Sequence, residues 1–442
     1  MQPGPDNSTS FLRNQFRWSL LSLPAALVTG SLVALFLWLL DKVTLIRWQH
    51  SWLLFLLPFA GILIFFLYRF AGKRIERGNN LIITEINEPG EGVPGRMAPA
   101  VLTATLITHL FGGSAGREGT AVQMGGSLFA LLARWMKLTK ADLRVLLTCG
   151  IAAGFGAVFG TPVAGAVFAL EALSTGLFRV RSFRSQASGS KIPGILHYQA
   201  LLPCLVAALI ADRTCAAYGI HHTVYQVTLP LLNDLPGTMI HFEWTVAGKV
   251  LLAGFCFGIA ARLFISLTFI IKSGSAKFIP IKWLVPFMGG LLIIALTFAL
   301  GTRDYLGLGV LNPQPDGVSI VSSFHEGGAA TFSWFWKLLF TAITIGMGFK
   351  GGEVTPLFFI GAALGNTLAI AGGVPVDLLA AAGMIAVFAA ATKTPFASVI
   401  MGVELFGVAP VLYLALGCVA ACLVAGKSGI YSDRNGVVKN SV

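Results

Sequence analysis

The 442-residue sequence has few charged residues, since Asp, Glu, Lys and Arg together make up only 11% of it, whereas 55% of its residues are hydrophobic. Soluble globular domains carry about 25% charged residues. A water-soluble fold this apolar would lack the polar surface needed to cover itself. Apolar runs at 16–40 and 52–70 are each long enough to cross about 30 Å of hydrocarbon. The sequence therefore predicts a membrane protein that contacts the lipid bilayer.

The sequence also lacks the motifs of several enzyme classes. It contains no GxSxG segment, its seven histidines form no HExxH pair, and its six cysteines have no metal-ligand spacing. We therefore expect no enzyme activity, no metal site and no cofactor. A purely structural membrane protein is disfavoured for a different reason, because it would not explain the repeated motifs described below.

Acidic residues are fewer than basic ones, which gives a formal net charge of +12 and raises the question of nucleic-acid binding. The basic residues, however, lie in short clusters between apolar runs, for example within 69–77 and 134–144. Such clusters are typical of cytoplasmic loops of membrane proteins. We expect no nucleic acid among the partners.

The chain divides into four parts. We expect a polar N-terminal lead at 1–15, a first transmembrane half at 16–230, a second transmembrane half at 231–432 and a short tail at 433–442. The 51 glycines and 20 prolines interrupt many of the apolar segments. Broken helices at membrane depth are tolerated only where the freed backbone is buried in protein or lines a cavity. This composition favours a transporter or a channel with many partial helices.

An internal repeat supports this interpretation. Thr161-Pro162 and Glu171 recur as Thr394-Pro395 and Glu404, an offset of 233 residues (162 to 395). Slightly upstream, the spacing of Glu118 and Gly126 recurs in the second half at an offset of 235 residues (118 to 353). Interrupted segments at matching places in two halves are the best sequence indication of a binding site near the bilayer midplane.

A glycine-rich segment places two ionisable residues in an apolar stretch. It reads Gly112-Gly-Ser-Ala-Gly116-Arg117-Glu118-Gly119, and a run typical of a helix follows. The first N–H groups of a helix have no internal partners and, with the positive helix end, they favour an anion. The Glu118 carboxylate could occupy that site when charged and leave it when protonated, which would couple anion passage to protons. The alternative is that Arg117 and Glu118 merely pair with other residues.

Four motifs, in the order expected, resemble those of the chloride-channel (CLC) family. They are Gly116-Arg-Glu-Gly119, Phe159-Gly-Thr-Pro-Val-Ala-Gly165 with Glu171, Gly351-Gly-Glu-Val-Thr-Pro356, and Gly426-Lys-Ser-Gly-Ile-Tyr431. The resemblance covers about residues 70–435. It implies an all-α integral membrane protein with a CLC-type fold of two inverted repeats and many partial, broken helices. It also implies a multi-pass protein of the bacterial inner membrane that forms a homodimer.

Three departures from the chloride-selective pattern resemble the bacterial fluoride/proton antiporters of this family. The first anion loop, Gly-Ser-Gly-Ile-Pro in chloride-selective members, here reads Gly-Asn79-Asn80-Leu-Ile. The third loop carries Glu353 and Thr355 where Ile-Phe-Ala-Pro is usual. Ala172 stands where chloride/proton exchangers have a second glutamate.

The resemblance implies a role for each site residue. Glu118 would be the gating, proton-carrying glutamate, and Glu353 would be a second carboxylate on the transport path. The anion-binding residues would be Asn79, Asn80, Gly116, Arg117, Gly119, Thr355 and Tyr431. Fluoride is a strong hydrogen-bond acceptor that needs good donors to replace its water, and amide and hydroxyl groups are such donors.

We therefore expect a secondary active transporter that exports cytoplasmic fluoride in exchange for protons. The alternative is a chloride channel or chloride/proton exchanger of the same fold. For Glu353 a second alternative is a structural role, as a hydrogen-bond anchor at the start of a helix.

Overall fold

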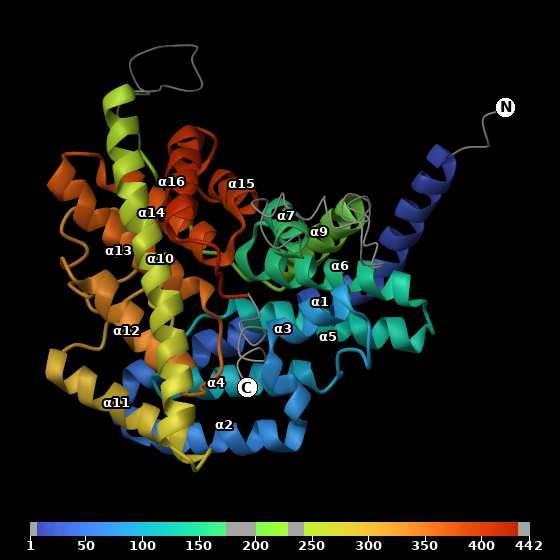
Figure 1. Ribbon diagram of the computed structural model, residues 1–442, viewed down its shortest axis with the longest axis horizontal. Helices are drawn as coiled ribbons and strands as arrows, with labels where there is room; N and C mark the ends of the chain where they lie inside the picture. The colour runs from blue at the N-terminus through green and yellow to red at the C-terminus, as the bar shows by residue number, and fades with distance from the viewer. Residues whose placement is uncertain (1–6, 174–199, 229–242, 432–442) are drawn as a thin grey trace, which may run out of the picture. The chain divides into compact units, whose positions relative to one another are not determined.

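The computed structural model describes residues 7–173, 200–228 and 243–431, and none of these residues forms a β-strand. The predicted all-α fold is confirmed. In chain order (Figure 1), the α-helices are α1 (Asn7–Gln49), α2 (Leu57–Ala71), α3 (Asn79–Asn87), α4 (Met97–Leu110), α5 (Glu118–Trp135), α6 (Lys140–Phe159), α7 (Pro162–Leu173), α9 (Leu201–Ala217), α10 (Trp244–Phe278), α11 (Leu284–Leu300), α12 (Ser333–Gly346), α13 (Val354–Gly372), α14 (Val376–Thr392), α15 (Pro395–Phe406) and α16 (Val411–Val424). Helix α1 begins inside the predicted polar lead, and the predicted tail lies outside the described residues.

Helix lengths agree with a membrane protein built partly from incomplete spans. Five segments of the described chain are long and apolar enough to cross a membrane, and they lie in α1, α2 with its preceding 3-10 turn, α6, α10 and α13. Several other apolar helices have only 10–17 residues, whereas about 20 are needed to span the hydrocarbon. These short helices are the partial helices expected from the glycine and proline content.

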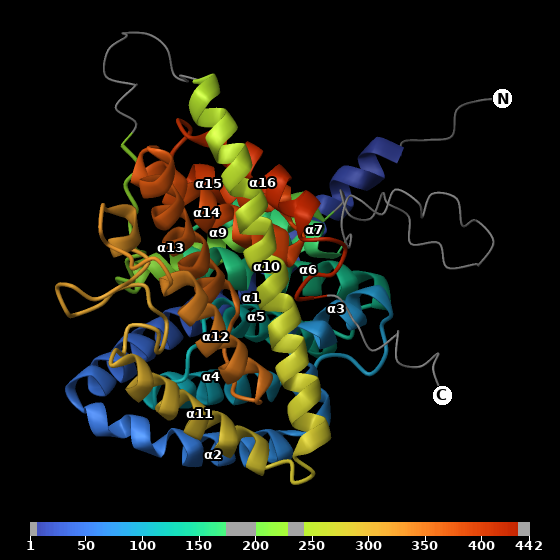
Figure 2. The same cartoon turned by 60° about the vertical axis from the view of Figure 1, so that its left-hand side comes forward.

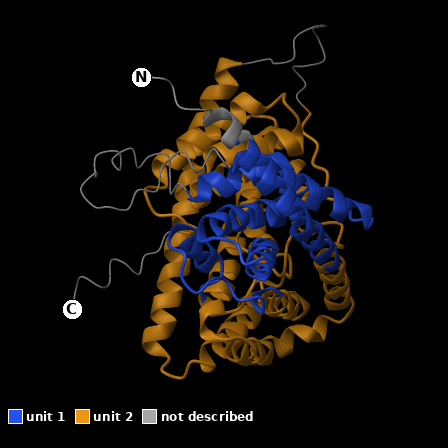
Figure 3. Ribbon diagram, turned by 90° about the vertical axis from the view of Figure 1, so that its right-hand side faces the viewer, with its two compact units in different colours: residues 1–35, 77–98, 121–221 blue, residues 36–76, 99–120, 222–442 orange. Residues whose placement is uncertain are grey.

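The chain forms two compact units (Figure 3). The first unit comprises 1–35, 77–98 and 121–221, and the second comprises 36–76, 99–120 and 222–442. The chain crosses between the units five times, and three of these crossings lie within α1, α4 and α5. This division differs from the halves 16–230 and 231–432, which rest on the sequence repeat and remain a prediction.

The repeat appears as the same local structure in each unit. Helix α6 ends at Gly160 with φ 72°, and α14 ends at the matching Lys393 with φ 66°. After each of these ends, a helix of 12 residues begins at a proline, Pro162 in α7 and Pro395 in α15. Proline suits the first helical position because the N–H it lacks would have no partner there. The Thr-Pro motifs therefore mark two equivalent helix breaks.

Glycines at nearly matching positions also let neighbouring helices approach closely in each unit. In the first unit, a Cβ added to Gly125 of α5 would overlap the carbonyl oxygen of Gly150 in α6. In the second unit, a Cβ added to Gly361 of α13 would overlap the carbonyl oxygen of Gly383 in α14. Gly150 and Gly383 are related by the same 233-residue offset. The repeat thus preserves a glycine contact between helices as well as a motif.

Helices α2 and α11 of the second unit lie side by side, as Figures 1 and 2 both show. Gly61 of α2 faces Pro286 of α11, and Gly290 of α11 faces Pro58 of α2, with no room for a side chain on either glycine. This reciprocal glycine–proline packing brings the two backbones close together without a polar contact.

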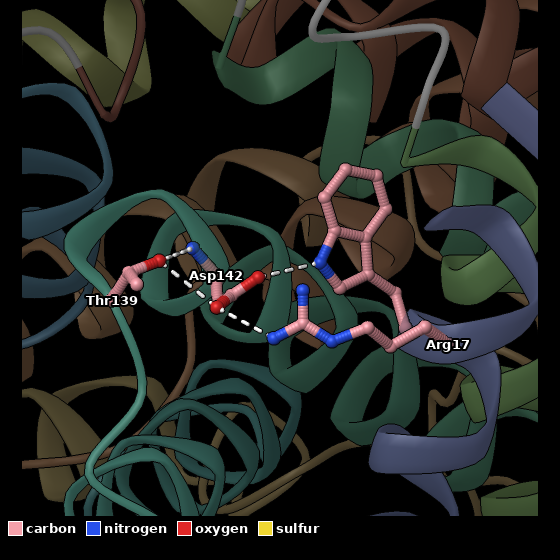
Figure 4. Close-up of polar contacts among 4 residues, drawn as sticks. Arg17, Thr139 and Asp142 are labelled. Atoms are coloured by element: carbon pink, nitrogen blue, oxygen red, sulfur yellow. Dashed lines mark hydrogen bonds and ion pairs between the residues drawn. The ribbon is translucent and has the colours of Figure 1, made fainter. Parts of the chain in front are cut away.

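In the first unit, the start of α6 is fixed by a buried carboxylate (Figure 4). Thr139 is the N-cap residue, and its hydroxyl accepts a hydrogen bond from the Asp142 amide at 3.2 Å and donates one to Asp142 Oδ2 at 2.9 Å. Asp142 also accepts hydrogen bonds from Arg17 Nη2 at 3.0 Å and from Trp18 Nε1 at 2.9 Å. The Thr139 side chain therefore caps α6, and the Asp142 side chain joins the first turn of α6 to α1.

Asp142→Asn should destabilise the protein, because an amide nitrogen cannot accept the hydrogen bonds that Oδ2 receives. We expect a loss of about 2 kcal/mol, the range for hydrogen bonds to a charged group. Thermal unfolding of the detergent-solubilised protein, followed by tryptophan fluorescence, measures this loss. Asp212→Asn is the control, since its partner Arg213 is 80% exposed and exposed pairs contribute little. Equal shifts in Tm for both variants would contradict this role of Asp142.

Candidate functional site

The starts of α5 and α13 are joined in the second unit by an antiparallel bridge between Gly116 and Gly352. Gly116 N donates to Gly352 O at 2.6 Å, and Gly352 N donates to Gly116 O at 2.7 Å. Glu118 opens α5 two residues after this bridge, and Glu353 precedes the first residue of α13. The two motifs matched by the repeat therefore meet at one place.

The Glu118 carboxylate lies across both helix starts. Its Oε2 accepts hydrogen bonds from the amides of Arg117 at 3.0 Å and of Thr355 at 3.1 Å, and its Oε1 accepts one from the Thr355 hydroxyl. The residue is 1% exposed. Amide groups at a helix start are suited to an anion, and here the bound anion is the chain's own carboxylate.

The two bridging glycines leave space for this arrangement. A Cβ on Gly352 would lie 2.9–3.1 Å from the amide nitrogens of Gly119, Glu118 and Arg117. A Cβ on Gly116 would lie 2.7 Å from Glu118 Oε2 and 3.0 Å from Thr355 Oγ1. The shortest of these distances, 2.7 Å at Gly116 and 2.9 Å at Gly352, are shorter than real Cβ contacts. A side chain at either position would therefore crowd the amides and the carboxylate of the site.

Arg117 contributes charge but does not anchor Glu118. Its Nε is 3.9 Å from Glu118 Oε1 and is buried without a hydrogen bond. The hydrogen bonds to the carboxylate come instead from the backbone and from Thr355.

Glu353 occupies the N-cap position of α13, but its side chain makes no capping hydrogen bond. No residue in the described part of the chain donates a hydrogen bond to this carboxylate. Lys272, near the C-terminal end of α10, lies close enough for its positive charge to attract this carboxylate. The alternative role as a hydrogen-bond anchor for the helix start is therefore not what the structure shows.

Tyr431 lies in the same region of the second unit. The charges of Glu353 and Glu118 both act on its hydroxyl. The segment before it is held by a hydrogen bond from Ile430 N to Ala391 O at 2.9 Å. Glu118, Glu353 and Thr355 thus lie at the same pair of helix starts, and Tyr431 lies within range of the charges of both carboxylates.

Asn79 and Asn80 belong to the first unit, where they form the first turn of α3. Gly78 precedes them with φ 55°, and Asn79 Oδ1 is buried without a hydrogen bond. A Cβ on Gly78 would lie 3.4 Å from Gln123 Nε2. An amide of α3 and one of α5 thus lie beside the same turn of the first unit. The part these asparagines play in anion binding remains a prediction.

The structure also adds residues that motif reading missed. The Ser114 hydroxyl is 2.9 Å from the Thr341 hydroxyl of α12, and the Ser114 amide donates to Thr344 Oγ1 at 3.1 Å. Tyr225 lies close enough to Glu118 and Arg117 for their charges to act on it. Nothing in the sequence predicted these contacts, because their partners are more than 100 residues apart. Among the described residues, no group of three side chains that could bind a metal comes together.

Comparison with known proteins agrees with this geometry. Residues 59–426 match the voltage gated chloride channel family. A chloride/fluoride channel protein of Pseudomonas syringae pv. tomato is 43% identical over 422 residues, which cover 94% of this chain and 85% of that protein. A proton/chloride exchange transporter of Vibrio cholerae is 25% identical over 401 residues, which cover 85% of this chain and 77% of that protein.

Solved structures show the same fold. The crystal structure of a CLC-type fluoride/proton antiporter superposes with a TM-score of 0.81 and 32% identity, covering 94% of this chain and 97% of that one. A slow cyanobacterial chloride/proton antiporter superposes with a TM-score of 0.70 and 21% identity, covering 96% and 98%. The chain belongs to the voltage gated chloride channel (CLC) family, as its motifs predicted. It is a multi-pass membrane protein of ion transport.

Proposed function

We propose that the protein is a fluoride/proton antiporter that exports cytoplasmic fluoride. The observation that carries this proposal is the position of the Glu118 carboxylate, which lies on the amide groups of two helix starts and on the Thr355 hydroxyl. The amide and hydroxyl donors suited to an anion thus hold the Glu118 carboxylate, and one proton can neutralise that carboxylate. Competition between that group and an ion is the simplest way to couple their movements.

The coupling follows from charge. While Glu118 is ionised, its carboxylate holds the amides of Arg117 and Thr355, and an anion cannot take the same donors. A proton bound to the carboxylate removes the charge that those donors favour, so the side chain can leave and fluoride can replace it. When fluoride departs, the carboxylate can return as it releases its proton. Each cycle then carries an anion and a proton in opposite directions.

The choice of fluoride is supported by the donors near Glu118. Fluoride is a strong hydrogen-bond acceptor, and the Thr355 and Tyr431 hydroxyls are donors to such an ion. Glu353 adds a second carboxyl group without a hydrogen-bonding partner among the described residues, and burial favours the neutral form of a carboxyl group. A protonated Glu353 could donate to fluoride. The Pseudomonas relative and the antiporter structure carry fluoride in their names, which supports the same ion.

Purified protein in liposomes tests the proposal, with fluoride and chloride efflux recorded by ion-selective electrodes and pH followed at the same time. We expect fluoride efflux far above chloride efflux, with proton uptake by the vesicles in a fixed ratio. Comparable chloride efflux would instead indicate a chloride/proton exchanger, and anion efflux without proton movement would indicate a channel.

Thr355→Val should lower the initial rate of fluoride efflux. Valine keeps the shape of threonine and the amide that donates to Glu118, but it removes the hydroxyl. A hydrogen bond to a charged acceptor contributes about 1.5 kcal/mol or more, so we expect a loss of about 10-fold. Thr355→Ser keeps the hydroxyl and is the matched control. Equal rates in the valine and serine variants would mean that fluoride is bound elsewhere.

We also propose that the protein works as a homodimer in the bacterial inner membrane. Both features are implied by the family resemblance. Cross-linking in native membranes, followed by gel electrophoresis, distinguishes a dimer from a monomer. A product at the monomer mass alone, with efficient cross-linker, would contradict the proposal.

A further inference from the structure

Two basic side chains are buried close together in the second unit, away from the hydrogen bonds of Glu118. Arg47 comes from the C-terminal end of α1 and is 8% exposed, and Lys337 comes from the first turns of α12 and is fully buried. The charge of Arg47 acts on Lys337. Like charges repel strongly in such surroundings, so this pair needs an explanation.

Both cations lie against the same backbone turn. Lys337 Nζ donates to Gly307 O at 2.7 Å and to Tyr305 O at 3.1 Å. A Cβ on Gly307 would lie 3.0 Å from Nη2 of Arg47. Gly307 has φ 63°. Both charged groups therefore lie next to this one glycine.

The two cations differ in how their donors are used. Two of the three N–H groups of Lys337 donate to carbonyl oxygens. Its Nζ also lies 5.3 Å from the centre of the Phe359 ring. The Arg47 guanidinium makes no hydrogen bond to any described residue, and its Nε is buried. Its only polar-type contact is with the Trp48 ring, 4.9 Å away. The buried Nε–H therefore has no acceptor among the described residues.

No carboxylate compensates these charges. Neither Arg47 nor Lys337 lies within 4 Å of an Asp or Glu side chain in the described parts of the chain. The other charged group near Arg47 is Arg303, which adds repulsion. The end of α1 offers about half a negative charge at most. Buried charges that lack partners are strongly destabilising, so this pair favours an acceptor that the described residues do not supply.

We propose that Arg47 and Lys337 hold a halide ion at a second site, distinct from the one occupied by the Glu118 carboxylate. The ion supplies the acceptor that the guanidinium lacks and offsets the repulsion between the two cations. A monatomic ion is favoured because the backbone leaves little room. A Cβ on Gly309 would already lie 3.2 Å from Lys337 Nζ, just as one on Gly307 would crowd Arg47.

The histidine at the end of α4 connects this place with the segment before Glu118. His109 is 1% exposed, and its ring nitrogens lie 2.8 Å from Thr105 O and 3.0 Å from Ala115 O. The charges of Arg47 and Lys337 both act on it. The charge of an ion bound by the two cations would therefore also act on His109, which contacts the turn before Gly116 and Arg117.

Crystals of the wild-type protein grown in sodium bromide test the proposal, with data collected at the bromine absorption edge. We expect an anomalous peak in contact with the Arg47 guanidinium and Lys337 Nζ. The peak should vanish in Arg47→Gln and persist in Arg262→Gln, which removes an exposed arginine of α10. A wild-type map that shows bromide elsewhere on the protein but no peak at Arg47 overturns the proposal, and so does a peak that survives in Arg47→Gln.

Discussion

Glu118→Gln is expected to abolish proton movement while leaving the protein folded. Glutamine keeps the size of the side chain and can still accept hydrogen bonds through one oxygen, but it cannot carry a proton. The structure places this carboxylate on the amides of Arg117 and Thr355, where only a change of charge would release it at a useful rate. Because glutamine carries no proton, we expect proton uptake coupled to fluoride efflux to fall at least about 100-fold, which is about 2.7 kcal/mol in activation free energy.

The measurement is the initial rate of pH change in liposomes loaded with fluoride, with the fluoride electrode read in parallel. Glu171→Gln is the control, since it replaces another buried glutamate with the same chemistry. That variant should keep coupled exchange. Proton uptake at the wild-type rate in Glu118→Gln would show that the proton travels by another group, and the proposed competition would be wrong.

The second large effect is expected for Glu353→Gln. Its carboxyl group stands at the start of α13 without a capping hydrogen bond, so the substitution removes no structural contact among the described residues. It does remove a group that can bind and release a proton beside the anion. We therefore expect fluoride turnover to fall at least about 10-fold, about 1.4 kcal/mol in activation free energy, with little change in Tm.

Exposed Glu326→Gln is the matched control for this loss of charge, and its transport rate should equal that of the wild type. A large drop in Tm with a normal rate for Glu353→Gln would instead assign Glu353 to folding. Measuring both the transport rate and Tm separates an effect on transport from an effect on stability. The transport rate alone does not make this distinction.

The local features of this protein could be predicted from its sequence. The Thr-Pro motifs mark the breaks at Pro162 and Pro395 because proline and the residue before it restrict the backbone wherever they stand. The start of α5 at Glu118 was likewise expected from the glycines before it. The family resemblance, rather than any local pattern, assigned Tyr431 to the site.

Long-range contacts could not be predicted in this way. The bond between Glu118 and Thr355 joins residues 237 positions apart, and the repeat predicted only that their segments are equivalent. Lys337 lies in an apolar run of α12, and nothing in that run of sequence predicts that Arg47 of α1 lies close to it. Such partners are chosen by helix packing, which depends on side chains from several segments at once.

The Gly116–Gly352 bridge has a consequence for how fast the protein can work. Two reciprocal hydrogen bonds make the starts of α5 and α13 a single joint, so neither helix can shift alone without breaking both bonds. In the proposed mechanism the movable obstruction is then the Glu118 side chain alone. Rotamer changes take picoseconds to nanoseconds when a side chain is unhindered. The pace of transport would therefore be set by the arrival of protons and ions at the joint.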